Sequence, residues 1–78
     1  MRTGWGPLRK IVAKSDVFMM TRIINGYSQR ELAKRSGLSH AYISMLERSI
    51  KPVGPATAKK LSDLLGKPVE ELFMITLE

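Results

Sequence analysis

The chain has 78 residues, of which 44% are hydrophobic and 26% are charged, with no cysteine and a formal net charge of +6. This length suits one small domain, and the balanced composition argues against a disordered chain. The lack of cysteine excludes disulfides and thiolate metal sites and is typical of a reducing cytoplasm. No apolar run approaches the length of a membrane span, and the first residues lack the pattern of a secretory signal. We therefore expect a cytoplasmic globular protein.

The basic residues are concentrated before residue 61. Residues 1–60 contain twelve Lys or Arg and three acidic residues, for a net charge of +9. Residues 61–78 contain one Lys and four acidic residues, for a net charge of −3. A basic body attracts nucleic acid, because release of counterions from the phosphate backbone favours binding. The charge pattern thus indicates a polyanionic partner, although basic residues also serve solubility alone.

Residues 1–14 precede the part of the chain with the clearest pattern. Two glycines and a proline within residues 4–7 interrupt regular structure. We predict a basic arm or a short extra helix over residues 7–14, followed by a domain of residues 15–78. Trp5 has two interpretations, a contact with the body or a partner, and a loosely packed terminus.

The first helix of the domain is predicted from Asp16 to Asn25. Ser15 and Asp16 suit a helix start, and Asn25 with Gly26 suits a helix end. The whole stretch from Leu8 to Asn25 is helix-forming, as one long helix or two, with apolar residues near helical spacing at Leu8, Ile11, Val12, Phe18, Met19 and Ile23.

Residues 28–48 have the strongest pattern in the chain, that of two short helices joined by a tight turn. Ser28 and, three residues later, Glu31 form a capping box at the start of the first helix. Gly37 allows the positive φ of a sharp helix exit, and Ser39 is a good cap for the second helix. This arrangement predicts a helix-turn-helix.

The second helix of this pair, predicted over residues 39–48, has two different faces. One stripe follows the helical repeat and is expected to be core: Ile43, Leu46, Glu47 and Ile50. The other stripe is small and polar near the helix start: His40, Ala41, Ser44, Met45 and Arg48. A major groove would meet the second stripe, because small side chains permit close approach.

The rest of the chain is predicted as a loop and two further helices. Prolines and a glycine place a loop at residues 50–54, and helices are expected at residues 55–65 and 68–73. Residues 74–77 have three interpretations: a strand, a helix extension or a dimer contact. The expected fold class is all-α, a compact bundle of about five short helices containing a helix-turn-helix, with an extra N-terminal segment.

Residues suited to catalysis are scarce. His40 is the only histidine, so neither a histidine-based triad nor a multi-histidine metal site can be built. No glycine-rich phosphate loop of Walker or dinucleotide type occurs, and the acidic residues are scattered. We expect no enzyme activity, no cofactor and no metal.

Residues 18–73 resemble the lambda-repressor-like helix-turn-helix domain, also called Cro-type or XRE-type, of bacterial and phage regulators. The matching stretches are Arg22, Gly26 to Ala33, Ser36 to Ser39, Tyr42 to Ser44, Leu46 to Arg48, Leu65 with Gly66, and Glu71 to Phe73. The combination is far more specific than any one stretch. The resemblance implies a five-helix DNA-binding domain that usually acts as a dimer on a near-palindromic operator.

The resemblance also implies roles for individual residues. Those expected to face base edges are His40, Ala41 and Ser44, with Met45 at the margin. Those expected to contact phosphates are Gln29, which would also cap its helix, Arg30, Tyr42, Arg48 and Lys51. Arg22 and Glu47 match an ion pair that ties the first helix to the recognition helix. Some positions also have simpler interpretations, namely a solvated His40, a packed Tyr42 and a space-filling Met45.

The chain departs from the family pattern in three places. The base-facing set lacks the Arg, Gln or Asn that read bases through two hydrogen bonds, so direct discrimination is expected to be modest. Residues 49–52 lack the glycine that often follows the recognition helix in this family. About fifteen residues at the start lie outside the family domain, and their basic side chains are expected to form an arm along DNA.

Two functions remain open from the sequence. The leading one is a sequence-specific regulator of transcription that binds double-stranded DNA, a repressor of phage or mobile-element type. It would act as a homodimer with recognition helices about 34 Å apart in successive major grooves. The alternative is a protein-interaction module on the same fold, an antitoxin or a modulator of another regulator. Its partner would contact the N-terminal arm or residues 73–77.

Overall fold

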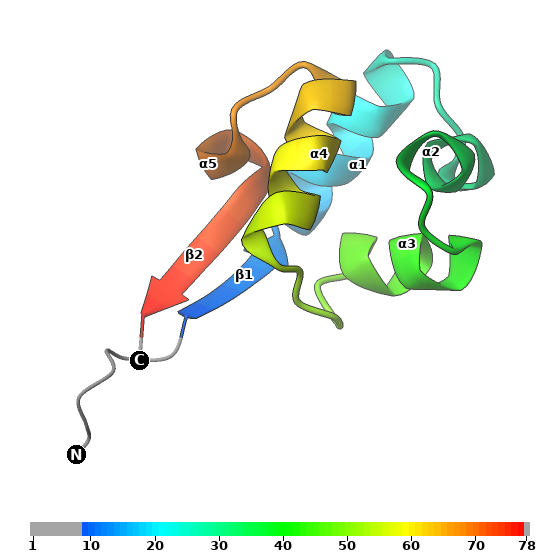
Figure 1. The fold of residues 1–78 in the computed structure, drawn as a ribbon. Coiled ribbons are helices and arrows are strands. Elements are labelled where there is room, and N and C mark those ends of the chain that lie inside the picture. Colours follow the sequence, from blue (N-terminus) through cyan, green and yellow to red (C-terminus); the bar gives the residue numbers. More distant parts are fainter. Residues whose placement is uncertain (1–8, 78) are drawn as a thin grey trace.

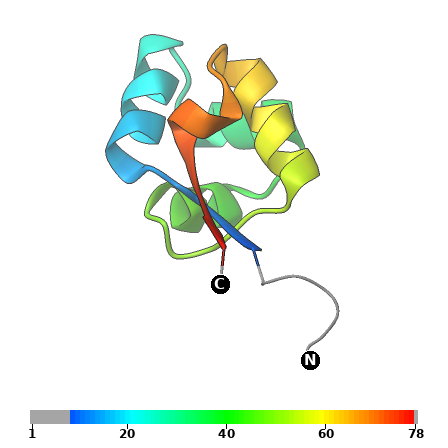
Figure 2. The same ribbon diagram turned by 90° about the vertical axis from the view of Figure 1, so that its left-hand side faces the viewer.

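A computed structural model describes residues 9–77, in which five helices and two strands follow one another (Figure 1). In chain order the elements are β1 (Arg9–Ala13), α1 (Ser15–Ile24), α2 (Gln29–Ser36), α3 (His40–Glu47), α4 (Pro55–Leu65), α5 (Val69–Leu72) and β2 (Phe73–Leu77). The helices pack together, and the two strands form a ribbon that projects from them (Figure 1). Figure 2 shows α1 and α4 on either side of α5.

The helical part of the prediction is confirmed with small shifts at the ends. The helix expected from Asp16 begins one residue earlier, and the one expected over residues 55–65 has these bounds. The helix expected over residues 68–73 is the single turn α5, because Phe73 already has an extended backbone with φ −129° and ψ 150°. Gly66 takes the left-handed conformation that ends α4, with φ 71°.

The prediction of a short helix over residues 7–14 is wrong, because residues 9–13 form the strand β1. β1 pairs antiparallel with β2 in a register that places Ile11 opposite Ile75. Ile11 and Ala13 are buried whereas Lys10 is exposed, an alternation typical of a half-buried strand. The apolar residues had suggested a helix because the strand depends on pairing with β2, which lies far away in the sequence and leaves no local signal. The rest of the expected arm, including Trp5, lies outside the described residues.

The fold is therefore mainly helical with a small sheet and is not purely all-α. Of the three interpretations of residues 74–77, the strand is the one that the structure shows. β1 and β2 come from opposite ends of the described chain, so the sheet closes that chain upon itself. The segment of residues 9–13 thus belongs to the same folded unit as the helices.

The core lies between the helices and the base of the ribbon. Phe18 of α1 and Phe73 of β2 are fully buried and meet edge to face, with ring centroids 5.8 Å apart. Other fully buried side chains come from α2, α3, α4 and α5: Leu32, Ile43, Leu46, Leu61 and Leu72. This core joins the ribbon to the helices that carry the candidate site.

The apolar residues Phe18, Met19 and Ile23 of α1 recur near helical spacing, but they differ in burial. The structure buries Phe18 but leaves Met19 41% and Ile23 55% exposed. Val17, Met20 and Ile24 are exposed as well, so most of the outer surface of α1 is apolar. An apolar residue at helical spacing therefore did not identify a buried one in this helix.

Candidate nucleic-acid interface

Helices α2 and α3 are joined by a tight turn whose residues satisfy the free ends of both helices. The Ser28 hydroxyl accepts a hydrogen bond from the Glu31 amide at 2.9 Å, and the Ser39 hydroxyl accepts one from the Tyr42 amide at 3.0 Å. Gly37 ends α2 with a φ of 77°. Only half of the predicted capping box forms, because the Glu31 carboxylate instead binds Arg35 at 2.8 Å.

The exposure of α3 shows which of its sides is free. Ile43, Leu46 and Glu47 are buried, as the core stripe requires. On the other side, His40, Ala41 and Arg48 are exposed, and Ser44 and Met45 are partly buried. The five residues therefore remain accessible on a helix whose opposite side is packed against the core.

Ile50 does not belong to the core stripe. It follows the end of α3 and is 57% exposed, because the chain changes direction at Ser49. The Ile50 amide donates to the Met45 carbonyl at 2.9 Å, and the Ser49 amide donates to the Leu46 carbonyl at 3.0 Å. These two bonds form a Schellman motif, which ends a helix at a residue with positive φ.

Ser49 lies in the glycine-free segment of residues 49–52, and it adopts a conformation that glycine would favour. Its φ is 63°, the single positive φ of a non-glycine residue among those described. The Ser49 hydroxyl donates to the carbonyl oxygen of Ala13 in β1 at 2.5 Å. This bond ties the end of α3 to the ribbon and helps to offset the cost of the left-handed backbone. Nothing in the sequence pattern indicated this contact.

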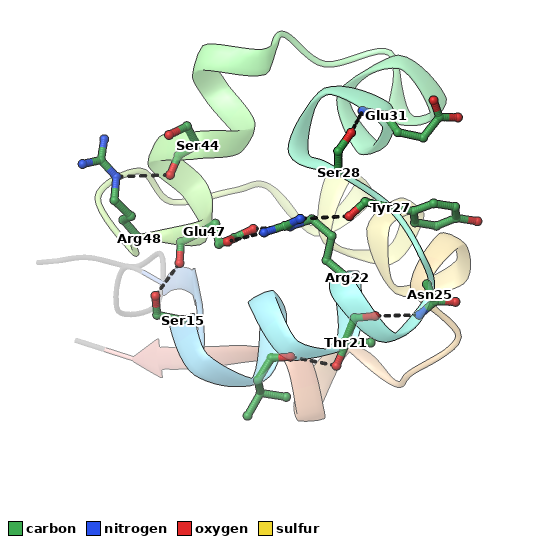
Figure 3. Close-up of polar contacts among 11 residues, drawn as sticks. Ser15, Thr21, Arg22, Asn25, Tyr27, Ser28, Glu31, Ser44, Glu47 and Arg48 are labelled. Carbon is green, nitrogen blue, oxygen red and sulfur yellow. Dashed lines mark hydrogen bonds and ion pairs between the residues drawn. The ribbon is translucent and has the colours of Figure 1, made fainter.

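A buried ion pair holds α3 to α1 (Figure 3). Arg22 Nε lies 2.7 Å from Glu47 Oε1, and Arg22 Nη2 lies 3.0 Å from Glu47 Oε2. A third bond runs from Arg22 Nη1 to the carbonyl oxygen of Tyr27 at 2.8 Å. Since Arg22 is 9% and Glu47 4% exposed, both charges depend on these partners.

Ser15 adds a further bond beneath α3 (Figure 3). Its hydroxyl donates to the carbonyl oxygen of Glu47 at 2.6 Å, and no side chain caps the start of α1. The sequence had suggested Ser15 as part of a cap for α1. In the structure the residue instead satisfies a carbonyl in the last turn of α3, which lacks an intrahelical partner.

The residues expected to contact phosphates lie around α3, but they differ in exposure and in the hydrogen bonds that they already make. Arg30, Arg48 and Lys51 are exposed. Gln29 is the first residue of α2 and is partly buried, while Ser28 provides the side-chain cap that had also been ascribed to Gln29. The Tyr42 hydroxyl donates its only proton to the Pro52 carbonyl at 2.9 Å. A phosphate contact by Tyr42 therefore requires exchange of that bond.

The acidic residues of the helix-turn-helix are both held in ion pairs. Glu47 binds Arg22 within the core, and Glu31 binds Arg35 on the surface of α2. Among the described residues, the remaining ion pairs join Lys59 to Asp63 and Lys67 to Glu71, on α4 and beside α5. The cations of the helix-turn-helix region without such a partner are Arg30, Lys34, Arg48 and Lys51. The surface around α3 is therefore cationic.

Within residues 9–77, no three His, Asp or Glu side chains gather as they would around a metal ion. The helices in this range are too short or too polar to cross a membrane. A shallow pocket with a volume of about 350 Å³ lies between α1 and Lys67.

The fold and its helix-turn-helix resemble known proteins. A family model described as helix-turn-helix, HTH_3, matches residues 19–72. The solved structure titled "hypothetical transcription factor NHTF from Neisseria" has a TM-score of 0.67 and 28% identity, and the match covers 73% of this chain and 66% of that one. This chain thus spans just under two-thirds of the Neisseria chain.

A second solved structure, that of the transcriptional regulator VanUg, has a TM-score of 0.63 with 100% of both chains covered. Its identity to this chain is 12%, so this likeness concerns the fold alone. A comparison with curated proteins finds no match. Because the family model covers more than half of the residues, the chain belongs to the lambda-repressor-like (XRE) family of helix-turn-helix proteins.

Proposed function

We propose that the protein is a transcriptional regulator that binds double-stranded DNA with α3 in the major groove. One observation carries this proposal. Both acidic residues of the helix-turn-helix are neutralised by ion pairs, whereas Arg30, Lys34, Arg48 and Lys51 have no acidic partner among the described residues. This leaves a cationic surface around a helix with small exposed residues, which suits a polyanion with a groove.

The start of α3 is the part that we place against base edges. His40 and Ala41 are the first two residues of the helix and are exposed, and Ser44 lies one turn later. Ala41 contributes only a methyl group, so it permits close approach and suits the methyl group of thymine. Met45 lies at the margin of this set and is partly buried. Such a set discriminates weakly, so phosphate contacts and DNA shape supply much of the affinity.

Phosphates would be bound on both sides of α3. The amides of Gln29 and Arg30 lie in the first turn of α2, where the helix dipole favours an anion. Arg48 caps the end of α3, and Lys51 lies in the loop that follows. Contacts on both flanks would fix the orientation of α3 in the groove without reading sequence.

The mechanism would be that of a repressor of phage or mobile-element type. A homodimer would place two copies of α3 in successive major grooves, about 34 Å apart, and thereby obstruct polymerase. Each protomer would discriminate only weakly between base sequences, and the second protomer would add its own discrimination. Dimerisation would therefore contribute to the specificity.

The salt dependence of DNA binding tests the cationic surface. Duplexes are first enriched by the wild-type protein from a random pool, and their affinity is then measured by fluorescence anisotropy across salt concentrations. The double substitution Arg48→Ala and Lys51→Ala should reduce the slope of log K against log salt by about 1.8, since each phosphate contact contributes about 0.9.

A matched control removes the same charge elsewhere. Lys59→Ala with Lys67→Ala also deletes two positive charges, but from exposed ion pairs beside α4 and α5. We expect this control to keep the wild-type slope. The phosphate assignment is wrong if the two double variants behave alike, and the DNA-binding function is wrong if no duplex is enriched.

A second function, that of a protein-interaction module, is favoured by the outer surface of α1. Val17, Met20 and Ile24 are 40%, 57% and 75% exposed and line the shallow pocket beside Lys67. This function predicts a stoichiometric protein partner whose binding is lost in Ile24→Asp, together with no selection of duplex sequences. Enrichment of a specific duplex by the purified protein would exclude it as the main function.

A further inference from the structure

The two edges of the β1–β2 ribbon are in different situations. On the outer side of β1, the Val53 amide donates to the Ile11 carbonyl at 2.9 Å, so this edge is partly covered. On the outer side of β2, no strand or bridge from residues 9–77 is paired. An open strand edge presents backbone donors and acceptors that can pair with another chain.

The register shows which groups of β2 point outward. The Lys14 amide donates to the Leu72 carbonyl at 2.8 Å, which marks this pair as hydrogen-bonded across the ribbon. In an antiparallel pair such positions alternate, so Ile11 and Ile75 form a pair without hydrogen bonds between them. The bond from Val53 to the Ile11 carbonyl agrees with this alternation. The amide and carbonyl of Ile75 therefore face the open edge.

The side chains of β2 do not protect that edge. Residues 73–77 include no charge and no proline, the residues with which proteins usually protect exposed strand edges. Met74 and Ile75 lie on opposite faces of the ribbon, and they are 53% and 51% exposed. An isolated two-stranded ribbon is marginally stable in water, so a further strand would benefit it.

We infer that β2 is the dimer interface of this protein, where it pairs with β2 of a second copy about a two-fold axis at Ile75. This inference rests on the proposed function in that it names the contact behind the proposed DNA-binding dimer. In this register Ile75 lies opposite Ile75 of the second copy, and the two residues exchange two backbone hydrogen bonds. Phe73 faces Leu77 of the second copy, and the Leu77 amide donates to the Phe73 carbonyl. The Phe73 amide is already bound to the Val69 carbonyl.

Charge supports a second copy as the occupant. The paired strands would be neutral, and the antiparallel arrangement brings the tip of each ribbon to the base of the other. Lys10 lies near the tip, opposite Thr76, and is exposed. Glu70 lies at the base, in α5 just before β2, and is also exposed. Among the described residues Glu71 is already paired with Lys67, whereas Glu70 has no ion pair. Each copy would thus bring a cation toward Glu70 of the other.

Two isoleucine substitutions test this interface. Ile75→Lys places two like charges opposite each other at the two-fold axis while leaving every backbone group in place. Ile24→Lys is the matched control, since Ile24 is 75% exposed on the apolar surface of α1, a different element. The dissociation constant of the dimer is measured by sedimentation equilibrium without DNA, and circular dichroism checks that both variants fold.

We expect the wild-type protein to be a dimer and Ile75→Lys to raise its dissociation constant by about 100-fold. Ile24→Lys should leave the constant unchanged. The inference is overturned if the wild-type protein is a monomer, if Ile75→Lys remains a dimer, or if Ile24→Lys also dissociates it.

The backbone part of the interface has its own test. In a chain made by chemical synthesis, N-methylation of Ile75 removes only the outward amide hydrogen and keeps the side chain. We expect dissociation here too, and an unchanged dimer would exclude pairing through this edge. Because these measurements contain no DNA, their failure leaves the proposed DNA-binding function to be decided by its salt dependence.

Discussion

The surface around α3 differs from the outer surfaces of α1 and of β2 in almost every physical respect. Around α3 the exposed residues are small, polar or cationic apart from Ile50, and the acidic residues are held in ion pairs. On α1 and β2 the exposed residues are mostly apolar and include Met20, Ile24 and Met74. The first surface suits phosphate and base edges, and the second suits protein. The two kinds of surface on this small domain therefore suit different kinds of partner.

What lies beneath the two surfaces differs too. α3 is held from below by the ion pair of Arg22 with Glu47 and by bonds from Ser15 and Ser49. β2 is held mainly by Phe73 in the core and by its ladder with β1. Polar contacts have defined directions, so they fix the orientation of α3 more narrowly than apolar packing would. The proposed entry of α3 into a groove requires such a fixed orientation.

The largest effect is expected from breaking the charged support of α3. Glu47→Ala leaves the guanidinium of Arg22 buried without its partner and should lower the free energy of unfolding by about 3 kcal/mol. Urea denaturation followed by circular dichroism measures this change. Replacing both residues by leucine should recover part of the loss, because no unpaired charge is then buried. If Glu47→Ala is as stable as the wild type, the ion pair of Arg22 with Glu47 does not stabilise the position of α3.

A smaller effect is expected at Ser49, where α3 is joined to the ribbon. Ser49→Ala removes the bond to the Ala13 carbonyl and keeps the left-handed backbone, so it should lower stability by about 1 kcal/mol. Ser49→Gly also removes the bond but relieves the backbone strain, so it should lie closer to the wild type. Thermal melts of the two variants give this comparison. Equal loss in both would show that backbone strain contributes little at this position.

The smallest effect is expected for the exposed ion pair on α2. Glu31→Gln breaks the ion pair with Arg35. Because the side chains of Glu31 and Arg35 are 40% and 50% exposed, this substitution should change the free energy of unfolding by less than about 0.5 kcal/mol. The same melts measure it beside Glu47→Ala. A loss as large as that of the buried pair would contradict the distinction between solvated and buried charge.

Local patterns predicted much of the fold. The caps Ser28 and Ser39, the left-handed Gly37 and the bounds of α4 follow from residues close together in sequence. The pairing of Arg22 with Glu47 came from the resemblance to a family, since residues 25 positions apart give no local signal. The roles assigned to His40, Ala41 and the phosphate-binding residues stay predictions.

The errors share one physical cause. Residues 9–13 looked helical because their partner strand lies more than 60 residues away, and pairing across that distance leaves no periodic trace nearby. Met19 and Ile23 show a related limit, because near-helical spacing indicates a helix without showing which of its residues the rest of the molecule covers. Ile50 was likewise expected in the core stripe, but the chain changes direction at Ser49 and leaves Ile50 exposed.

By itself, then, the sequence determined helices α1 to α4, the turn between α2 and α3 and the excess of cations, because these depend on neighbouring residues and on composition. The tertiary structure decided the rest. It closed the described chain through β1 and β2, gave Ser15 and Ser49 to the support of α3, and left the apolar side chains of α1 and β2 exposed. These features depend on contacts between distant segments, which form only when the whole core is assembled.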